Sequence, residues 1–212
     1  MNAGTMAICE PARDRSTVAG YRLAAALLCA LIGAPAFALD LPELMTLLAQ
    51  QRGGEAEFSE QRFVKGLERP LTASGTLTFA APDRFVRKTL KPRPETMAID
   101  GNTITLTRGG RSRTLTLDAA PEMVAIIEAF RGTLGGNIQT LQRYFTPVLA
   151  GSTDDWTLGL TPLEPGLAAR IRGIRIGGRG AEVNRFEIQL ADGDRSLMTI
   201  QPVRPAGAAS TP

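Results

Sequence analysis

The sequence predicts an α+β, mainly β domain: a strongly curved antiparallel sheet with helices across its open side. Residues 58–101 contain three runs in which apolar and polar side chains alternate, and four more such runs follow residue 156. Between them, residues 121–148 change to a helical period. A sheet with one apolar face must bury that face, and three amphipathic helices would find no place beside a two-sheet sandwich.

The first 38 residues are predicted to be a cleaved secretory signal peptide. Arg13, Arg15 and Arg22 precede a short apolar run, and the small-residue sequence A-P-A-F-A ends at Ala38. The apolar run is about ten residues long, whereas a membrane-spanning helix needs about 20. A retained membrane anchor and translation from Met6 are the alternatives. We therefore expect a periplasmic protein.

Composition excludes several classes of function. The chain has no histidine, and both cysteines (Cys9 and Cys29) would leave with the signal peptide. The usual zinc sites, a Ser-His-Asp triad and a Cys-His pair are thereby excluded. A net charge of only +3 argues against nucleic acid as a partner. We expect no enzymatic activity and no cofactor.

The N-terminal half should contain one helix and six strands. Pro42 suits the first turn of a helix over residues 41–52, Leu44, Leu47 and Leu48 form its apolar stripe, and Gly53-Gly54 end it. The predicted strands cover residues 56–64, 72–80, 84–91, 95–100, 103–108 and 112–117. Asp100-Gly101-Asn102 and Gly109-Gly110 are hairpin turn signals.

The C-terminal half should contain two helices and four strands. One apolar stripe consists of Met123, Ile126, Ile127 and Phe130, and a second one of Ile138, Leu141, Tyr144, Phe145 and Val148. Strands are predicted at 156–160, 168–176, 181–190 and 195–201, and residues 202–212 read as a disordered tail. Residues 39–201 thus form a single predicted domain.

The polar features have two interpretations each. A basic run could dock on acidic partners or lipid phosphates, or could be a solvated strand face; it contains Arg84, Arg87, Lys88, Lys91 and Arg93. Glu60 and Arg62 could pair across strands, which is usually structural. Asp154 and Asp155 are adjacent and should point apart, so we reject them as a catalytic pair.

Five short motifs follow one another along the chain. They are F-x-E-Q-R-F from Phe58, S-G-x-L-x-F-x-x-P-x-x-F from Ser74, I-D-G from Ile99, W-x-L-x-L-T-P from Trp156 and D-G-D-x-S-x-M-x-I from Asp192. In this order they resemble the LolA family of periplasmic outer-membrane lipoprotein carriers. The resemblance covers residues 41–200 and is greatest to a shorter LolA-like branch. It implies a half-barrel with a helical lid over an apolar cavity. It also implies a monomer whose cargo is an acylated lipoprotein or lipid, with an inner-membrane donor complex and an outer-membrane acceptor.

Apolar residues of the sheet and of the two central helices are the candidate lipid-binding side chains. On the sheet these are Phe58, Leu77, Phe79, Phe85, Met97, Ile99, Trp156, Leu158, Phe186 and Met198; on the helices they are Met123, Ile126, Phe130, Leu141 and Phe145. Periodicity alone favours a solid core at these positions, since apolar periodicity marks a core more often than a pocket. The resemblance favours a cavity.

Two departures from the family concern its cargo. The carriers have an arginine that controls the lid and cargo release at the position of Ala81, and Arg84 is the candidate to replace it. The carriers also continue with a loop and a strand beyond the position of Ile200. A glycolipid or lipid-linked metabolite is therefore an alternative cargo. A lipid-sensing interaction domain of the same fold is an alternative function, and a small periplasmic hydrolase is a further one.

Overall fold

The computed structural model describes residues 39–117 and 121–203. These contain α2 (Leu41–Ala49), α3 (Pro121–Leu134), α4 (Ile138–Tyr144) and the short α5 (Pro165–Ala168). Asp40 begins α2 by accepting a hydrogen bond from the Glu43 amide at 2.8 Å. The predicted signal peptide and residues 204–212 of the predicted tail lie outside the described residues.

The described strands form a single antiparallel sheet in which the first and last strands pair at the centre. The strands are β1 (Gly53–Phe63), β2 (Leu71–Ala80), β3 (Arg84–Lys91), β4 (Glu95–Asp100), β5 (Thr103–Arg108), β6 (Arg111–Thr116), β7 (Phe145–Ser152), β8 (Asp155–Pro162), β9 (Ile171–Arg179), β10 (Glu182–Leu190) and β11 (Arg195–Pro202). Their order is β6-β5-β4-β3-β2-β1-β11-β10-β9-β8-β7. Consecutive strands therefore build two halves that join through β1 and β11.

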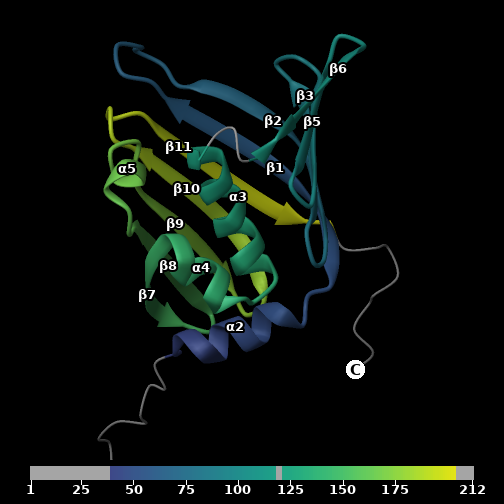
Figure 1. Ribbon diagram of the computed structural model, residues 1–212. Coiled ribbons are helices and arrows are strands. Elements are labelled where there is room, and N and C mark those ends of the chain that lie inside the picture. The colour runs from purple at the N-terminus through teal and green to yellow at the C-terminus, as the bar shows by residue number, and fades with distance from the viewer. Residues whose placement is uncertain (1–38, 118–120, 204–212) are drawn as a thin grey trace, which may run out of the picture. The chain divides into compact units, whose positions relative to one another are not determined.

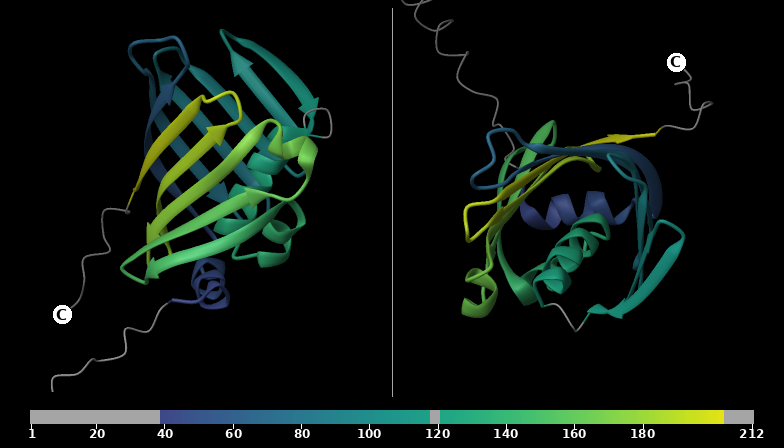
Figure 2. Two further views of the ribbon diagram at one scale, coloured as in Figure 1. Left: turned by 90° about the vertical axis from the view of Figure 1, so that its left-hand side faces the viewer. Right: turned by 90° about the horizontal axis from the view of Figure 1, so that it is seen from above.

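The sheet curves around the helices (Figures 1 and 2). Viewed from above, β1–β6 and β7–β11 form the two arms of the curve, and α2 and α3 lie on its concave side. Gly75 contributes to the bend: the register of β2 and β3 shifts beside it, and a Cβ atom there would lie 1.9 Å from the Lys88 carbonyl oxygen. The predicted α+β, mainly β fold with a strongly curved sheet and a helical cover is confirmed.

Several predicted boundaries are wrong. Helix α2 ends at Ala49 rather than at residue 52, and the glycines predicted to end it, Gly53 and Gly54, begin β1. The second central helix ends at Tyr144, and the residues from Phe145 to Ser152 form the edge strand β7 instead. Pro147 explains this, because proline disrupts a helix interior but is tolerated in an edge strand. Residues 165–168 form α5, so the predicted strand begins at Ile171 rather than Ala168. Pro202 belongs to β11, where it pairs with Ala56, and is not part of a tail.

Candidate functional site

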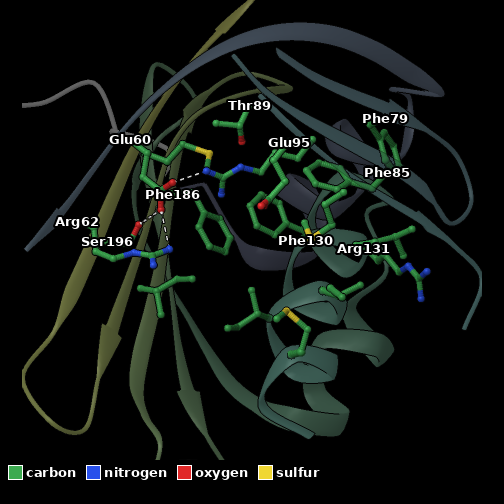
Figure 3. A pocket seen from close by; sticks show the side chains of 18 of the residues that line it. Glu60, Arg62, Phe79, Phe85, Thr89, Glu95, Phe130, Arg131, Phe186 and Ser196 are labelled. Carbon is green, nitrogen blue, oxygen red and sulfur yellow. Dashed lines mark hydrogen bonds and ion pairs between the residues drawn. The ribbon is translucent and has the colours of Figure 1, made fainter. Parts of the chain in front are cut away.

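A cavity of about 560 Å³ lies between α3 and the concave face of the sheet (Figure 3). Strands β1 to β5, β10 and β11 supply one wall and α3 supplies the other. Its apolar lining consists of Phe79, Phe85, Met97, Ile99, Leu106, Met123, Ile126, Ile127, Phe130, Leu134, Phe186, Ile188, Leu190 and Met198. We call this space the apolar cavity.

Three phenyl rings cross the apolar cavity from one arm of the sheet to the other. Phe130 of α3 stacks on Phe186 of β10, with ring centroids 3.7 Å apart, and on Phe85 of β3, at 5.4 Å. Figure 3 shows these rings in the middle of the space. Because β3 and β10 lie on opposite sides of the β1–β11 centre, Phe130 connects the helix to both arms.

The structure divides the predicted lipid-binding residues into two groups. Those that line the apolar cavity are Phe79, Phe85, Met97, Ile99, Met123, Ile126, Phe130, Phe186 and Met198. Those buried in the core without lining it are Phe58, Leu77, Leu141, Phe145, Trp156 and Leu158. Trp156 is fully buried, and its indole N–H donates to the Gly180 carbonyl at 2.9 Å, which is the environment of a packing residue. Phe145 begins β7 and so is not a lid residue.

One end of the apolar cavity is polar. Glu60 of β1 is 6% exposed; it pairs with Arg87 of β3 and accepts a hydrogen bond from the Ser196 hydroxyl of β11. Arg62 approaches the same carboxylate at 3.7 Å. The Arg87 guanidinium also lies 4.6 Å from the centre of the Phe58 ring. The cluster therefore joins three strands across the middle of the sheet.

The pKa of Glu60 reflects this cluster. Burial raises the pKa, but the hydrogen bond from Ser196 and the charges of Arg87 and Arg62 together lower it by more. The net result is a pKa below the ordinary value of a glutamate. Glu60 thus remains an anion that fixes Arg87 on the concave face.

A second space, a groove of about 460 Å³, adjoins this polar end. It shares Glu60, Arg62, Arg87, Thr89 and Glu95 with the apolar cavity. Its other lining residues are Leu71, Thr72, Ala73, Pro92, Arg93 and Arg108. We call it the basic groove.

The structure does not place Arg84 against the central helices. Its side chain is 69% exposed and forms an ion pair with Asp100 at 3.4 Å. Arg131 of α3 makes the corresponding contact from the other side: it donates to the Asp83 carbonyl at 3.1 Å and to the Gly101 carbonyl. Glu128 accepts a further hydrogen bond from it at 2.9 Å. Sequence reasoning missed Arg131 because the partners are backbone carbonyls, which leave no pattern.

Arg87 also lies where the sequence analysis did not expect it. The basic run was interpreted as a docking edge or a solvated face, yet Arg87 shares the concave face with Phe85 and Thr89, two residues away on each side. This two-residue spacing was the signal in the sequence that Arg87 faces the same side of the sheet as Phe85. Leu106, Ile188 and Leu190 were missed as lining residues, although they alternate in step with Ile104 and Phe186.

No helix among residues 39–117 and 121–203 is long and apolar enough to cross a membrane. The same residues contain no group of three or more acidic, His or Cys side chains that could hold a metal ion.

Comparison with known proteins identifies the family. Residues 33–211 match the sequence profile of a family described as "outer membrane lipoprotein carrier protein LolA-like". The chain belongs to the LolA-like family. LolA-like proteins are carriers and binding proteins rather than enzymes and act outside the cytoplasm. Family membership supports binding of a lipid or an acylated protein.

Solved structures similar to this LolA-like chain have low sequence identity. A LolA superfamily protein from Nitrosomonas europaea is 8% identical, with 79% of this chain and 94% of that chain covered and a TM-score of 0.42. A DUF1329 family protein from Desulfovibrio piger is 11% identical, with 81% and 92% covered and a TM-score of 0.46. A putative outer membrane lipoprotein-sorting protein domain from Vibrio parahaemolyticus is 9% identical, with 80% and 92% covered and a TM-score of 0.41. No match was found among proteins with curated functions.

Proposed function

We propose that this LolA-like protein is a periplasmic carrier that binds the acyl chains of a lipoprotein or related lipid in the apolar cavity and ferries it toward the outer membrane. The observation that carries the proposal is the apolar cavity itself. Its volume of about 560 Å³ lies within the range of roughly 300–1,000 Å³ typical of ligand pockets. Apolar side chains from the sheet and α3 form most of its walls, and polar residues gather mainly at the end that contains Glu60 and Arg87.

Acyl chains form no hydrogen bonds, so a carrier must bind them by removing CH₂ groups from water, which contributes about 0.8 kcal/mol per group. The cavity side chains suit this task because several are only partly buried in the empty protein. Phe79, Met97, Leu106 and Phe130 all retain exposed surface that cargo would cover. The acyl chains and these side chains would both lose their contact with water when cargo binds.

Helix α3 serves as the lid in this proposal. It supplies one wall of the apolar cavity, and Arg131 attaches its last turn to the carbonyls of Asp83 and Gly101 at the rim of the sheet. Cargo would enter when this attachment opens, from a donor complex at the inner membrane, and would leave to an outer-membrane acceptor. We expect a monomer without a cofactor, exported by cleavage after Ala38.

Mass spectrometry of organic extracts tests the proposal. Protein purified from periplasm should carry an acyl species in stoichiometric amount, and N-terminal sequencing should begin at Leu39. Delipidated protein that is reloaded with the same species should recover the original ratio. An extract without lipid, from protein that also fails to reload, would contradict a carrier, and a released product of cleaved cargo would indicate an enzyme.

A further inference from the structure

The basic groove carries an excess of positive charge next to the polar end of the apolar cavity. Four arginines and two glutamates line it: Arg62, Arg87, Arg93, Arg108, Glu60 and Glu95. The pair of Glu60 and Arg87 is close and hydrogen-bonded, so these two charges compensate each other. The other three arginines are Arg62, Arg93 and Arg108. For their charges the groove offers only Glu95 and a 3.7 Å contact between Arg62 and Glu60.

The ion pairs of these three arginines are weak. Arg62 lies 3.7 Å from Glu60 and Arg108 lies 3.9 Å from Glu95, and the arginine side chains are 57% and 58% exposed. Arg93 has no ion pair or hydrogen bond within the part of the chain that the structure describes. Exposed pairs of this length contribute little stability, so a ligand can take over these guanidinium groups at small cost.

Strand register keeps the groove continuous with the cavity. Glu95 pairs with Thr89 on one side and with Arg108 on the other, so three neighbouring strands present their groove residues in one row. Two residues further along β4, Met97 is opposite both Arg87 and Leu106 on the cavity wall. An amphiphile with its chains between α3 and the sheet would therefore place its head group among the arginines.

We propose that the basic groove binds the anionic, phosphate-bearing head group of the lipid whose acyl chains occupy the apolar cavity. This inference rests on the proposed function for the position of the chains. A guanidinium group matches phosphate with two parallel hydrogen bonds, and an excess of two positive charges matches a phosphate monoester, which carries about −1.5 to −2 at neutral pH. Glu60 holds Arg87 in place at the junction between chains and head group.

Two lipids with identical chains separate the head-group site from the chain site. Dioctanoyl phosphatidate and dioctanoylglycerol, both as monomers, would be titrated into delipidated protein by calorimetry, with inorganic phosphate as a third ligand. Wild-type protein should bind the phosphatidate at least tenfold more tightly than the glycerol lipid, and inorganic phosphate only weakly. The double variant R93Q/R108Q should lose this preference and keep its affinity for dioctanoylglycerol.

The chain offers a matched control. Arg175 on β9 is 60% exposed and lies 3.9 Å from Glu187, which matches Arg108 in exposure and in ion-pair distance. Neither Arg175 nor the exposed Arg172 lines either space. R172Q/R175Q changes the net charge equally and should retain the preference. Equal affinities of wild-type protein for the two lipids, equal losses in both double variants, or phosphate binding as tight as phosphatidate binding would each overturn the head-group site. Failure to bind either lipid would instead contradict the proposed function.

Discussion

The two arms of the sheet have the same alternating pattern of side chains but different interiors. On β8 and β9 the inward side chains of Trp156, Leu158, Leu160, Ile174 and Ile176 are 0–1% exposed. On β2, β4 and β5 the inward side chains of Phe79, Met97 and Leu106 remain partly exposed and line the apolar cavity. We call β8 and β9, which face a filled core, the filled arm, and β2 to β5, which face the apolar cavity, the hollow arm; the cavity also extends to Phe186 of β10 and Met198 of β11.

The helical cover explains the difference. Helix α4 leads into β7 and contacts it, and Leu141 of α4 is fully buried. Helix α3 covers β2 to β5 and reaches Phe186 of β10, with side chains that are partly exposed, such as Ile126, Phe130 and Leu134. A protein interior is usually close-packed, so a loosely covered arm is the part available for a ligand. We expect the filled arm to contribute more stability, although Leu77, Ile99 and Ile104 of the hollow arm are also buried.

A buried charge should distinguish the arms most strongly. Leu158→Glu places a carboxylate in the filled arm at a cost of several kcal/mol, comparable to the stability of a typical domain of about 5–15 kcal/mol. Phe79→Glu places it in the apolar cavity, where water can follow. We expect Leu158→Glu to lose its cooperative thermal transition and Phe79→Glu to keep it but to lose lipid binding. If both variants lost the transition, measured by circular dichroism, the hollow arm would be a solid core.

Truncation of large side chains should give the next largest contrast. Trp156→Ala should lower the free energy of unfolding by about 3–5 kcal/mol, because it opens a cavity and leaves the Gly180 carbonyl without its partner. Met97→Ala removes a side chain that already faces a space, so its cost should stay below the ~2 kcal/mol at which buried truncations begin. Urea denaturation of both variants measures this. Equal costs would mean that the two arms are equally packed.

The centre of the sheet, between the arms, should respond to pH. Glu60 has a lower pKa in the folded protein than in the unfolded chain, so its stabilising contribution is complete above the unfolded pKa and is lost as the pH falls through the folded one. Glu60→Gln should therefore cost about 1–3 kcal/mol near neutral pH and progressively less in acid. Glu187→Gln is the control, because the contact of Glu187 with Arg175 is 3.9 Å long. A difference between wild type and Glu60→Gln that does not shrink in acid would contradict the role assigned to this carboxylate.

Much of the fold was predictable because alternation and turn residues are local. Ten of the described strands and the helices α2 and α3 follow from patterns in residues 41–201. Strand β7 was not predictable from periodicity, since Phe145 and Val148 also fit a helical stripe. Only Pro147 marked the change.

The interior was less predictable. Trp156 and Phe79 both occupy inward positions of alternating strands, and nothing in the sequence says which of them is fully buried and which lines a space. That outcome depends on where the helices lie across the sheet, which is a tertiary property. The polar end could not be predicted for a similar reason: Glu60, Arg87 and Ser196 meet only because β1 pairs with β11 on one side and with β2 on the other, and β2 pairs with β3.

The smallest expected effect concerns the attachment of α3 to the hollow arm. Arg131→Leu removes the hydrogen bonds to the Asp83 and Gly101 carbonyls and should favour opening of α3 by about 1 kcal/mol, which is roughly a fivefold increase in hydrogen exchange of its amides. Arg84→Leu removes an exposed ion pair at the same rim and should change exchange little. If closure of α3 drives release, Arg131→Leu should also transfer cargo to acceptor vesicles more slowly than Arg84→Leu. Equal transfer by both variants, despite faster exchange in one, would separate lid opening from release and place the release step at the acceptor.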